Sequence, residues 1–339
     1  MLRHLKQVIR RILKFFFSDR TSLAIQLARD YLYDCRRFYR GSALVRLDTR
    51  QRIEGWIIQD YHRIEKGLIA LEPRIFGEYF RDRLVRNVED FVEQYGITPQ
   101  VAAAIKNLRL YVEFHQKLGA ELSEEFNARV QSLQAHCNGT KENGVLAGYK
   151  EIRRSEISAS QKVDYTSFIR SRTSVREYLR EPVELSTLKK AISNALYYPS
   201  VCNRQHCRVR LFTNKQQIDQ ILALQNGNWT FRSEVFTLLV VTSDLSYFCS
   251  VGEKNQGYVD GGIFAMNTVL SLHAEGLGTC MLNWSRDRGS DLQLKRLLRL
   301  PDEEIVIMMI AVGYMKEQFR AAVSAKRQLD EVLIVDPGL

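Results

Sequence analysis

The spacing of hydrophobic residues changes character near residue 165. Before that point, apolar side chains recur at three- and four-residue steps with few β-branched runs, which predicts helices almost throughout residues 20–135. The expected helices cover residues 22–39, 50–67, 74–95, 99–118 and 123–136. The stretch CNGTKENG at 137–144 is rich in Gly and Asn, so it predicts a loop at the end of this helical region.

After residue 165, short apolar runs alternate with helical patterns. Helices are expected at 165–170, 185–196 and 259–275, and strands at 207–213, 235–242, 278–284 and 305–314. This alternation predicts an α/β (α+β) fold whose central sheet is covered by helices on both faces. We therefore divide the chain into residues 1–18, a helical region at 19–150 and a sheet-containing domain at 165–339.

The first 18 residues, MLRHLKQVIRRILKFFFS, predict a basic amphipathic helix with apolar and basic residues on different sides. The apolar row is Leu2, Leu5, Ile9, Ile12 and Phe16, and the basic row is Arg3, Lys6, Arg10 and Lys14. Such a helix can lie on an anionic membrane surface or pack against its own protein, and the sequence leaves both open. No apolar run reaches the roughly 18 residues that a membrane-spanning helix needs, so any membrane contact would be peripheral, at the inner face.

The charge pattern argues against nucleic-acid binding. The formal net charge is +10, but residues 1–50 hold 12 Lys/Arg against four Asp/Glu, whereas the rest of the chain holds 37 against 35. A nucleic-acid-binding domain would carry a basic surface with interleaved aromatic residues beyond the N-terminus. With 45% hydrophobic and 26% charged residues, the composition is that of a globular protein.

The six cysteines are scattered without a CxxC pair, which is typical of reduced thiols in a cytoplasmic protein. Cys202, His206 and Cys207 lie close in sequence, but their spacing matches no standard zinc site and no second ligand pair follows. We therefore expect no metal, and we interpret Cys202 and Cys207 as packing thiols.

The most polar cluster of the helical region is YHRIEKG at 61–67. His62, Glu65 and Lys66 would share one helix face. They favour an ionic network at the end of a helix closed by Gly67, although a functional site is the alternative.

In the second half, the segment IRSRTSVREY at 169–178 alternates arginines with hydroxyl residues. Guanidinium groups suit bidentate phosphate binding, and Ser and Thr hydroxyls can complete the set of donors. The candidate phosphate-binding residues are Arg172, Thr173, Ser174 and Arg176. Alone this pattern is weak, because Arg/Ser runs are common on solvated surfaces.

A second block, YPSVCNRQH at 198–206, ends a predicted helix with a Pro-Ser turn and presents Asn203 and Gln205 before a strand. Each side-chain amide carries both a donor and an acceptor, which suits a heterocycle edge with alternating N–H and C=O groups.

Two further blocks follow. The predicted helix at 259–275 is apolar nearly all round, so it belongs in a core or an interface. Gly276 and Gly278 end it and let the backbone come close to a planar partner. A strand then ends in Gly313-Tyr314, and Lys326-Arg327 precede the sequence LDEV.

In this order, the four blocks resemble the nitroreductase family of FMN-dependent oxidoreductases. The resemblance covers roughly residues 165–335 and implies a nitroreductase-like central sheet flanked by helices. It further implies FMN as cofactor, NAD(P)H as reductant and a homodimer with FMN at the subunit interface.

The resemblance also assigns roles. It implies that the Arg172–Arg176 segment contacts the FMN phosphate and ribityl chain, and that Asn203, with Gln205 nearby, faces the isoalloxazine edge. Arg327 resembles the second cation at the phosphate, and the backbone near Leu282 and Asn283 resembles the segment under the flavin N5 edge. No side chain is identified as an acid, a base or a nucleophile, since flavin itself carries the electron transfer.

Two features depart from the family pattern. His206-Cys207 stand where many members have Pro-Trp, which leaves the substrate range open. The helical N-terminal half is also unusual, and residues 50–150 could supply a lid. Its segment YHRIEKGL is similar to one in longer nitroreductase-like proteins of bacterial polysaccharide gene clusters.

Two hypotheses follow. In the first, the chain uses NAD(P)H to reduce a small electron-poor acceptor, such as a nitro compound or a quinone, by alternating reduction and oxidation of FMN. In the second, it is an accessory protein of polysaccharide biosynthesis, held at the inner membrane face by residues 1–18, that binds flavin without such turnover or binds no flavin.

Overall fold

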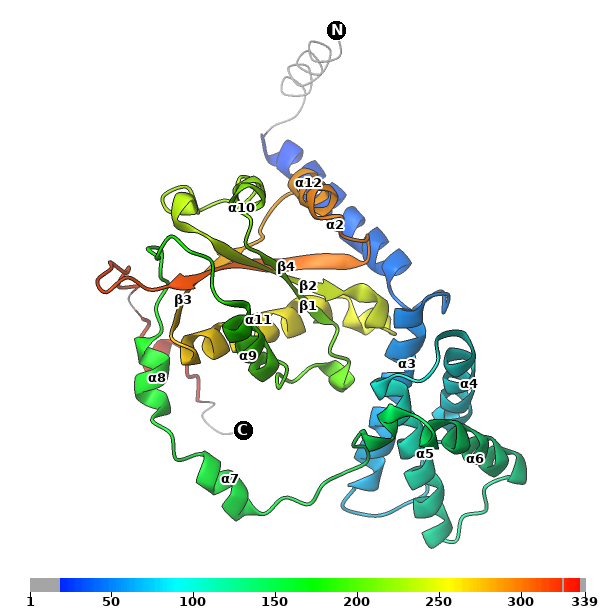
Figure 1. The fold of residues 1–339 in the computed structure, drawn as a ribbon. Coiled ribbons are helices and arrows are strands. Elements are labelled where there is room, and N and C mark those ends of the chain that lie inside the picture. The colour runs from blue at the N-terminus through cyan, green and yellow to red at the C-terminus, as the bar shows by residue number, and fades with distance from the viewer. Residues whose placement is uncertain (1–18, 325, 336–339) are drawn as a thin grey trace.

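The computed structural model describes residues 19–324 and 326–335. It shows a group of helices beside a sheet domain, connected by a long strap (Figure 1). The amphipathic helix expected at 1–18 lies outside the described residues. No helix in the described ranges has the length and hydropathy to cross a membrane.

The helical region matches the hydrophobic pattern closely. Its helices are α2 (Asp19–Gly41), α3 (Arg50–Leu68), α4 (Glu78–Tyr95), α5 (Pro99–Lys117) and α6 (Glu124–Asn138). Thr49, Thr98 and Ser123 cap three of them by accepting backbone N–H groups. The expectation that α4 begins at residue 74 is wrong, because Gly77 has a left-handed φ of 92° and helical structure starts only after it.

The sheet has four antiparallel strands in the order β1-β2-β4-β3. The strands are β1 (Cys207–Phe212), β2 (Thr237–Asp244), β3 (Leu277–Asn283) and β4 (Glu304–Tyr314). β1 and β3 are therefore the two edges. All four strands lie within about two residues of the ranges that the sequence predicts.

Helices cover both faces of the sheet, as predicted (Figure 1). On one face lie α9 (Leu185–Ala195) and α11 (Gln256–Ala274), and on the other lie α10 (Lys215–Leu222) and α12 (Arg288–Leu298). Alternate residues of β2 serve the two cores: Leu238 and Val240 pack with the α10/α12 face, and Leu239 and Val241 pack with the α9/α11 face.

An exposed strap connects the two parts of the chain. It contains η1 (Lys141–Gly144), α7 (Arg154–Ser160) and α8 (Tyr165–Ser171), and it runs around the molecule in Figure 1. Leu146 and Val163 are 93% and 68% exposed.

The helical region also contacts the sheet domain directly. α3 packs against η4 (Leu245–Tyr247), and the Tyr247 hydroxyl donates to Glu54 at 2.8 Å. A Cβ on Gly55 would lie only 2.9 Å from the Tyr247 Cα, so the close approach of this helix requires a glycine.

Candidate functional site

The arginine-rich segment lies against the edge strand β3. Ser174 forms a bridge with Thr279, and the Val175 amide donates to the Thr279 carbonyl at 2.9 Å. Further along, the Leu179 amide donates to the Tyr314 carbonyl at 2.9 Å. The segment therefore crosses the end of the sheet at which β3 starts and β4 ends.

Two glycines make this docking possible. A Cβ on Gly278 would lie 3.0 Å from Val175 and 2.8 Å from Met315, and a Cβ on Gly313 would lie 2.6 Å from the Tyr178 ring. At Gly278 the backbone thus comes close to side chains of the same chain, Val175 and Met315, where the sequence predicted a planar partner. The planar side chain of Tyr178 lies instead against Gly313.

Arg172, Thr173, Ser174 and Arg176 follow directly after α8 and are all partly buried. Within the described residues, neither Arg172 nor Arg176 forms an ion pair with a carboxylate. Arg176 donates to the Ser174 carbonyl at 3.4 Å, and its guanidinium carbon lies 5.9 Å from the Phe231 ring centroid. Partly buried cations without a counter-ion favour the binding of an anion.

The β3 edge offers backbone groups next to these arginines. In an antiparallel ladder, backbone groups of successive residues point alternately to the two sides of the strand. Because the Thr279 carbonyl faces the arginine segment, Met281 and Asn283 direct their backbone groups away from β4 as well. Gln225 donates to the Asn283 carbonyl at 3.0 Å from that side. The Leu282 side chain points elsewhere, into the α10/α12 core.

Asn203 and Gln205 lie at the opposite edge of the sheet, in the loop before β1. Thr279 is level with the start of β2 through Val312, whereas Cys207 is level with Ser243 near the end of β2. Six residues of strand separate these levels, roughly 20 Å at the usual rise. A single chain therefore does not bring the amide loop and the arginine segment together.

Arg327 lies in the exposed C-terminal segment. It pairs with Glu331 at 2.9 Å, beside η6 (Leu329–Glu331). In the described part of the chain, no hydrogen bond or ion pair joins Arg327 to the Arg172–Arg176 segment.

The sequence did not predict two polar residues of this region, one beside the end of α8 and one at the edge of β3. His273, in the last turn of α11, lies 2.8 Å from the Ser171 hydroxyl, and its ring centroid is 5.0 Å from that of Phe168. Gln225, which contacts Asn283, follows α10. For His273 the sequence offers one signal, its position at the end of a predicted helix, and for Gln225 it offers none.

His206 and Cys207 have structural roles in this fold. His206 is buried, with Nε2 2.8 Å from Asp260 and Nδ1 2.9 Å from Ser243. Burial raises the pKa of the Cys207 thiol to about 12, so it stays protonated near neutral pH. Within the described ranges, no cluster of three His, Cys, Asp or Glu side chains could hold a metal ion.

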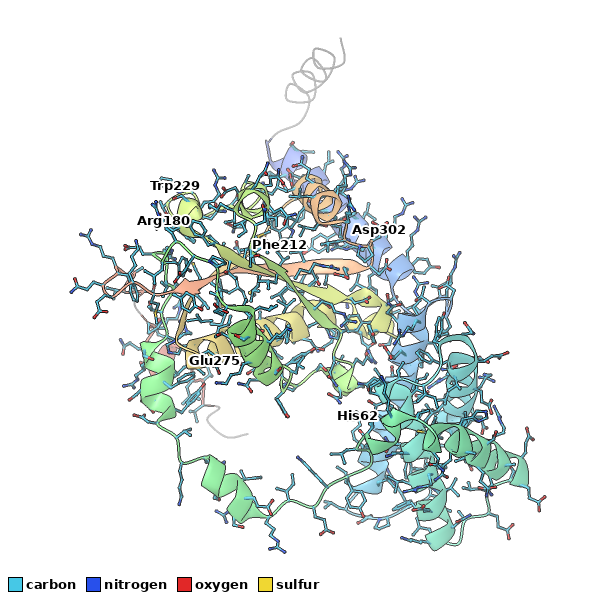
Figure 2. The ribbon with its side chains drawn as sticks, viewed as in Figure 1. His62, Arg180, Phe212, Trp229, Glu275 and Asp302 are labelled. Atoms are coloured by element: carbon cyan, nitrogen blue, oxygen red, sulfur yellow. The ribbon has the colours of Figure 1, made fainter. Side chains whose placement is uncertain are left out.

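In the polar cluster on α3, contacts join His62, Glu65 and Asn107. His62 lies on this helix (Figure 2). Its Nδ1 lies 3.0 Å from Glu65 Oε2, and Asn107 Nδ2 donates to Glu65 Oε1 at 3.1 Å. Asn107 in turn accepts the Gly148 amide, which fixes the start of the strap. The helix ends one residue after Gly67, at Leu68.

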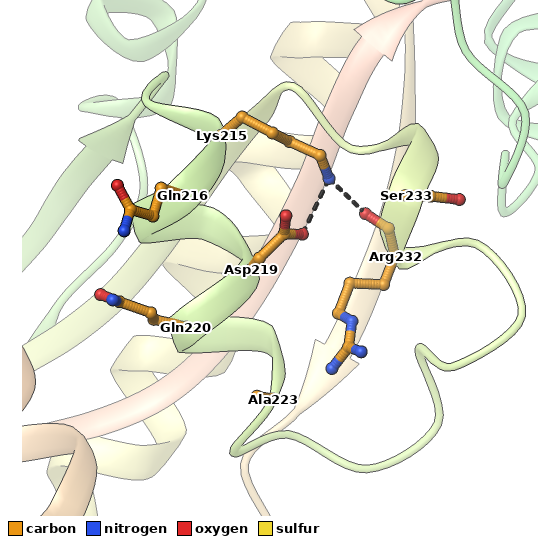
Figure 3. Close-up of a pocket in the computed structure, with 7 residues that line it drawn as sticks. All are labelled: Lys215, Gln216, Asp219, Gln220, Ala223, Arg232 and Ser233. Carbon is orange, nitrogen blue, oxygen red and sulfur yellow. Dashed lines mark hydrogen bonds and ion pairs between the residues drawn. The ribbon is translucent and has the colours of Figure 1, made fainter.

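A hollow of about 830 Å³ lies between α10 and η3 (Arg232–Glu234), away from the predicted contacts (Figure 3). Its Lys215 is already engaged, since Nζ lies 2.8 Å from Asp219 and 2.9 Å from the Arg232 carbonyl. The hollow therefore offers no free lysine for an anion.

Among models of protein families, that of the Nitroreductase family is similar to part of this chain. The model of the Nitroreductase family matches residues 169–251 and 250–314, less than half of the chain. No curated protein matches the sequence.

Solved structures that are similar to this chain cover about half of it. They include an FMN-dependent nitroreductase from Clostridium difficile, with 21% identity over 50% of this chain and 99% of that chain and a TM-score of 0.44. A nitroreductase family protein from Streptococcus pneumoniae has 18% identity over 51% and 100%, also with a TM-score of 0.44.

Proposed function

We propose that the chain is an FMN-dependent oxidoreductase that takes electrons from NAD(P)H and reduces a small, electron-poor acceptor. The observation that carries this proposal is that Arg172 and Arg176, in the segment that docks on the edge strand β3, are partly buried and form no ion pair with a carboxylate among the described residues. They lie inside the segment that matches the Nitroreductase family.

The residues present fit the phosphate end of FMN. Arg172 and Arg176 would neutralise the phosphate charge, and the hydroxyls of Thr173 and Ser174 would donate to its oxygens or to the ribityl chain. Arg327 would add a third cation if the C-terminal segment folds toward the site. When bound, the flavin supplies the hydride and electron transfer.

The β3 edge would hold the ring system. The backbone groups of Met281 and the Asn283 amide point to this side, so they can hydrogen-bond to a planar heterocycle that lies along the strand, whereas the Asn283 carbonyl already accepts from Gln225. The cation of Arg176 would favour the anionic form of a reduced ring placed near it.

Asn203 and Gln205 would reach the same flavin from a second copy of the chain. Support comes from α11, whose residues Val259, Ile263 and Met266 are 52%, 39% and 36% exposed at helical spacing. An apolar stripe of this kind is typical of a subunit interface. We therefore propose a homodimer in which each site draws the arginines from one chain and the amides from the other.

We propose a cytoplasmic protein whose residues 1–18 contact the inner membrane face. Co-sedimentation with anionic liposomes compares the full chain with one that starts at residue 19, and equal sedimentation would remove this proposal.

Anaerobic spectroscopy tests the proposed activity. The purified full chain, loaded with FMN, should show flavin absorbance that bleaches when NADH or NADPH is added and returns when an acceptor such as a quinone is added. Bound FMN that neither nucleotide reduces would contradict the activity and favour the accessory role in polysaccharide biosynthesis. A chain that takes up no FMN would also contradict the activity and favour an accessory role without flavin.

A further inference from the structure

The amide loop before β1 has an unusual backbone. Cys202, Asn203 and Gln205 have φ values of 50°, 53° and 50°, which is the left-handed region. Residues with a side chain avoid this region, and three of them within four positions persist only where the surroundings hold them. What holds this loop therefore also determines where its amides point.

The residue between them, Arg204, is the main anchor. Its side chain is fully buried, and Nη1 lies 2.8 Å from Glu253 while Nη2 donates to Gln59 at 2.6 Å. Glu253 belongs to the sheet domain, in η5 (Val251–Glu253), whereas Gln59 belongs to α3 of the helical region. One buried guanidinium thus joins the loop to both parts of the chain.

The other end of the loop is held within the sheet domain alone. Asp260 on α11 accepts the Val201 amide at 2.9 Å and lies 2.8 Å from His206. The backbone N–H of Gln205 donates to the Ser200 hydroxyl at 3.1 Å. Gln59 is therefore a direct side-chain contact between the helical region and Arg204, whereas Glu54 of α3 reaches the loop only through Tyr247 and Arg208.

A buried cation is sensitive to the loss of a partner, because desolvation is costly and few acceptors are within reach. In the described part of the chain, neither Nε nor Nη1 of Arg204 has a hydrogen-bond acceptor, so Nη1 meets Glu253 only as an ion pair and the side-chain oxygen of Gln59 is the hydrogen-bond acceptor of Nη2. Without the Gln59 oxygen, we expect the side chain to move toward water and to take the strained loop with it.

We infer that Gln59 is a positioning residue through which the helical region sets the conformation of Asn203 and Gln205. The consequence for flavin binding rests on the proposed function, whereas the effect on the loop does not. This gives the N-terminal half a role in shaping the site without contact with the ligand.

The test uses three variants of the full chain. Gln59→Leu removes the acceptor at nearly constant size, and Gln59→Glu keeps one. Gln51→Leu makes the same chemical change at an exposed position of the same helix and is the matched control. Hydrogen–deuterium exchange of the peptide covering residues 200–206 reports on the loop without ligand, and quenching of FMN fluorescence reports its affinity.

We expect Gln59→Leu to speed exchange in this peptide about tenfold and to weaken FMN binding by a similar factor, because a hydrogen bond to a charged group is lost. Gln59→Glu and Gln51→Leu should stay close to wild type in both measurements. Unchanged exchange in Gln59→Leu would overturn the inference, as would equal effects in Gln51→Leu. A wild-type chain that binds no FMN would instead sink the proposed function, and the exchange data would still decide on Gln59.

Discussion

Arg172 provides the sharpest test at the scale of single residues. Arg172→Ala should weaken FMN binding by a factor of about 10 to 100, equivalent to about 1.5–3 kcal/mol, because a charge-assisted phosphate contact is lost. Arg180→Ala is the control, since Arg180 is exposed and pairs with Glu234 at 2.8 Å (Figure 2). Fluorescence titration measures both, and equal affinities in Arg172→Ala and wild type would contradict the assignment.

Gly313 tests how the arginine segment is held. In Gly313→Ala the new Cβ would lie 2.6 Å from a Tyr178 ring that is itself buried and tied by its hydroxyl to the Val175 carbonyl. The ring cannot move away freely, so we expect a loss of about 1–3 kcal/mol in the free energy of unfolding.

Gly139→Ala is the matched control for this change, because nothing lies within 4 Å of a Cβ there. Its effect should stay within about 0.5 kcal/mol in urea denaturation. If the two variants lose the same stability, close packing at Gly313 is not the cause.

The sequence indicates which residues have the chemistry to bind a ligand, but it does not indicate where the fold places them. Alternation of arginines and hydroxyls marked the segment at 172–176, and side-chain amides marked Asn203. Sequence order does not reveal that the two lie at opposite edges of one sheet, because strand order depends on pairings between residues that are far apart in the chain. Gln59 had no signal, since its role depends on a contact with Arg204, 145 positions away.

At the scale of elements, the long helices, apart from the start of α4, and all four strands agree with the ranges that the sequence predicts, as do the short helices α8 and α9, whereas α7, α10 and α12 were not predicted. α3, α5 and α11 have many apolar positions, and all four strands have continuous apolar runs. α10 and α12 have only eight and 11 residues, but both carry apolar side chains at helical spacing, such as Ile218, Ile221 and Leu222, and a capping Asn214 or Asp287, so the sequence does hold a helical signal for them. They form because the sheet face beneath them needs covering.

α12 carries a pH-dependent contribution to stability. Lys295 is buried, and its burial, followed by the nearby charge of Arg37, lowers its pKa from 10.5 to about 8 despite Asp291, Asp302 and Glu303. Between pH 8 and pH 10.5, Lys295 therefore binds more protons in the unfolded chain than in the folded chain. The contribution of Lys295 to stability therefore rises with pH in this window and is lost as pH falls through 8.

Denaturation of wild type and Lys295→Met at several pH values isolates this effect. The stability of wild type relative to the variant should increase by about 1–2 kcal/mol from pH 8 to pH 9.5. A difference that stays constant over this range would show that Lys295 is not held with a lowered pKa.

At the scale of the whole molecule, the proposed site needs two chains. Arg172→Ala and Asn203→Gly should each impair FMN binding, and glycine is chosen at 203 because the φ there is 53°. When both variants are co-expressed with different tags, mixed dimers contain one intact site and one doubly altered site. Random pairing in a two-fold dimer then restores about a quarter of the wild-type sites.

Sites restored in the mixed preparation, but absent from each variant alone, would support a shared site. A mixed preparation that binds no more FMN than the separate variants would show that the arginines and amides do not come from different chains. Sedimentation of each sample checks that the dimers still form.

The most direct measurement is a titration of the full-length apoprotein with FMN and, in parallel, with riboflavin, which has the same ring but no phosphate. If guanidinium groups beside β3 hold a flavin phosphate, FMN will bind at one molecule per chain and at least about tenfold more tightly than riboflavin. Equal affinity for the two, or no saturable binding of FMN, would contradict the account.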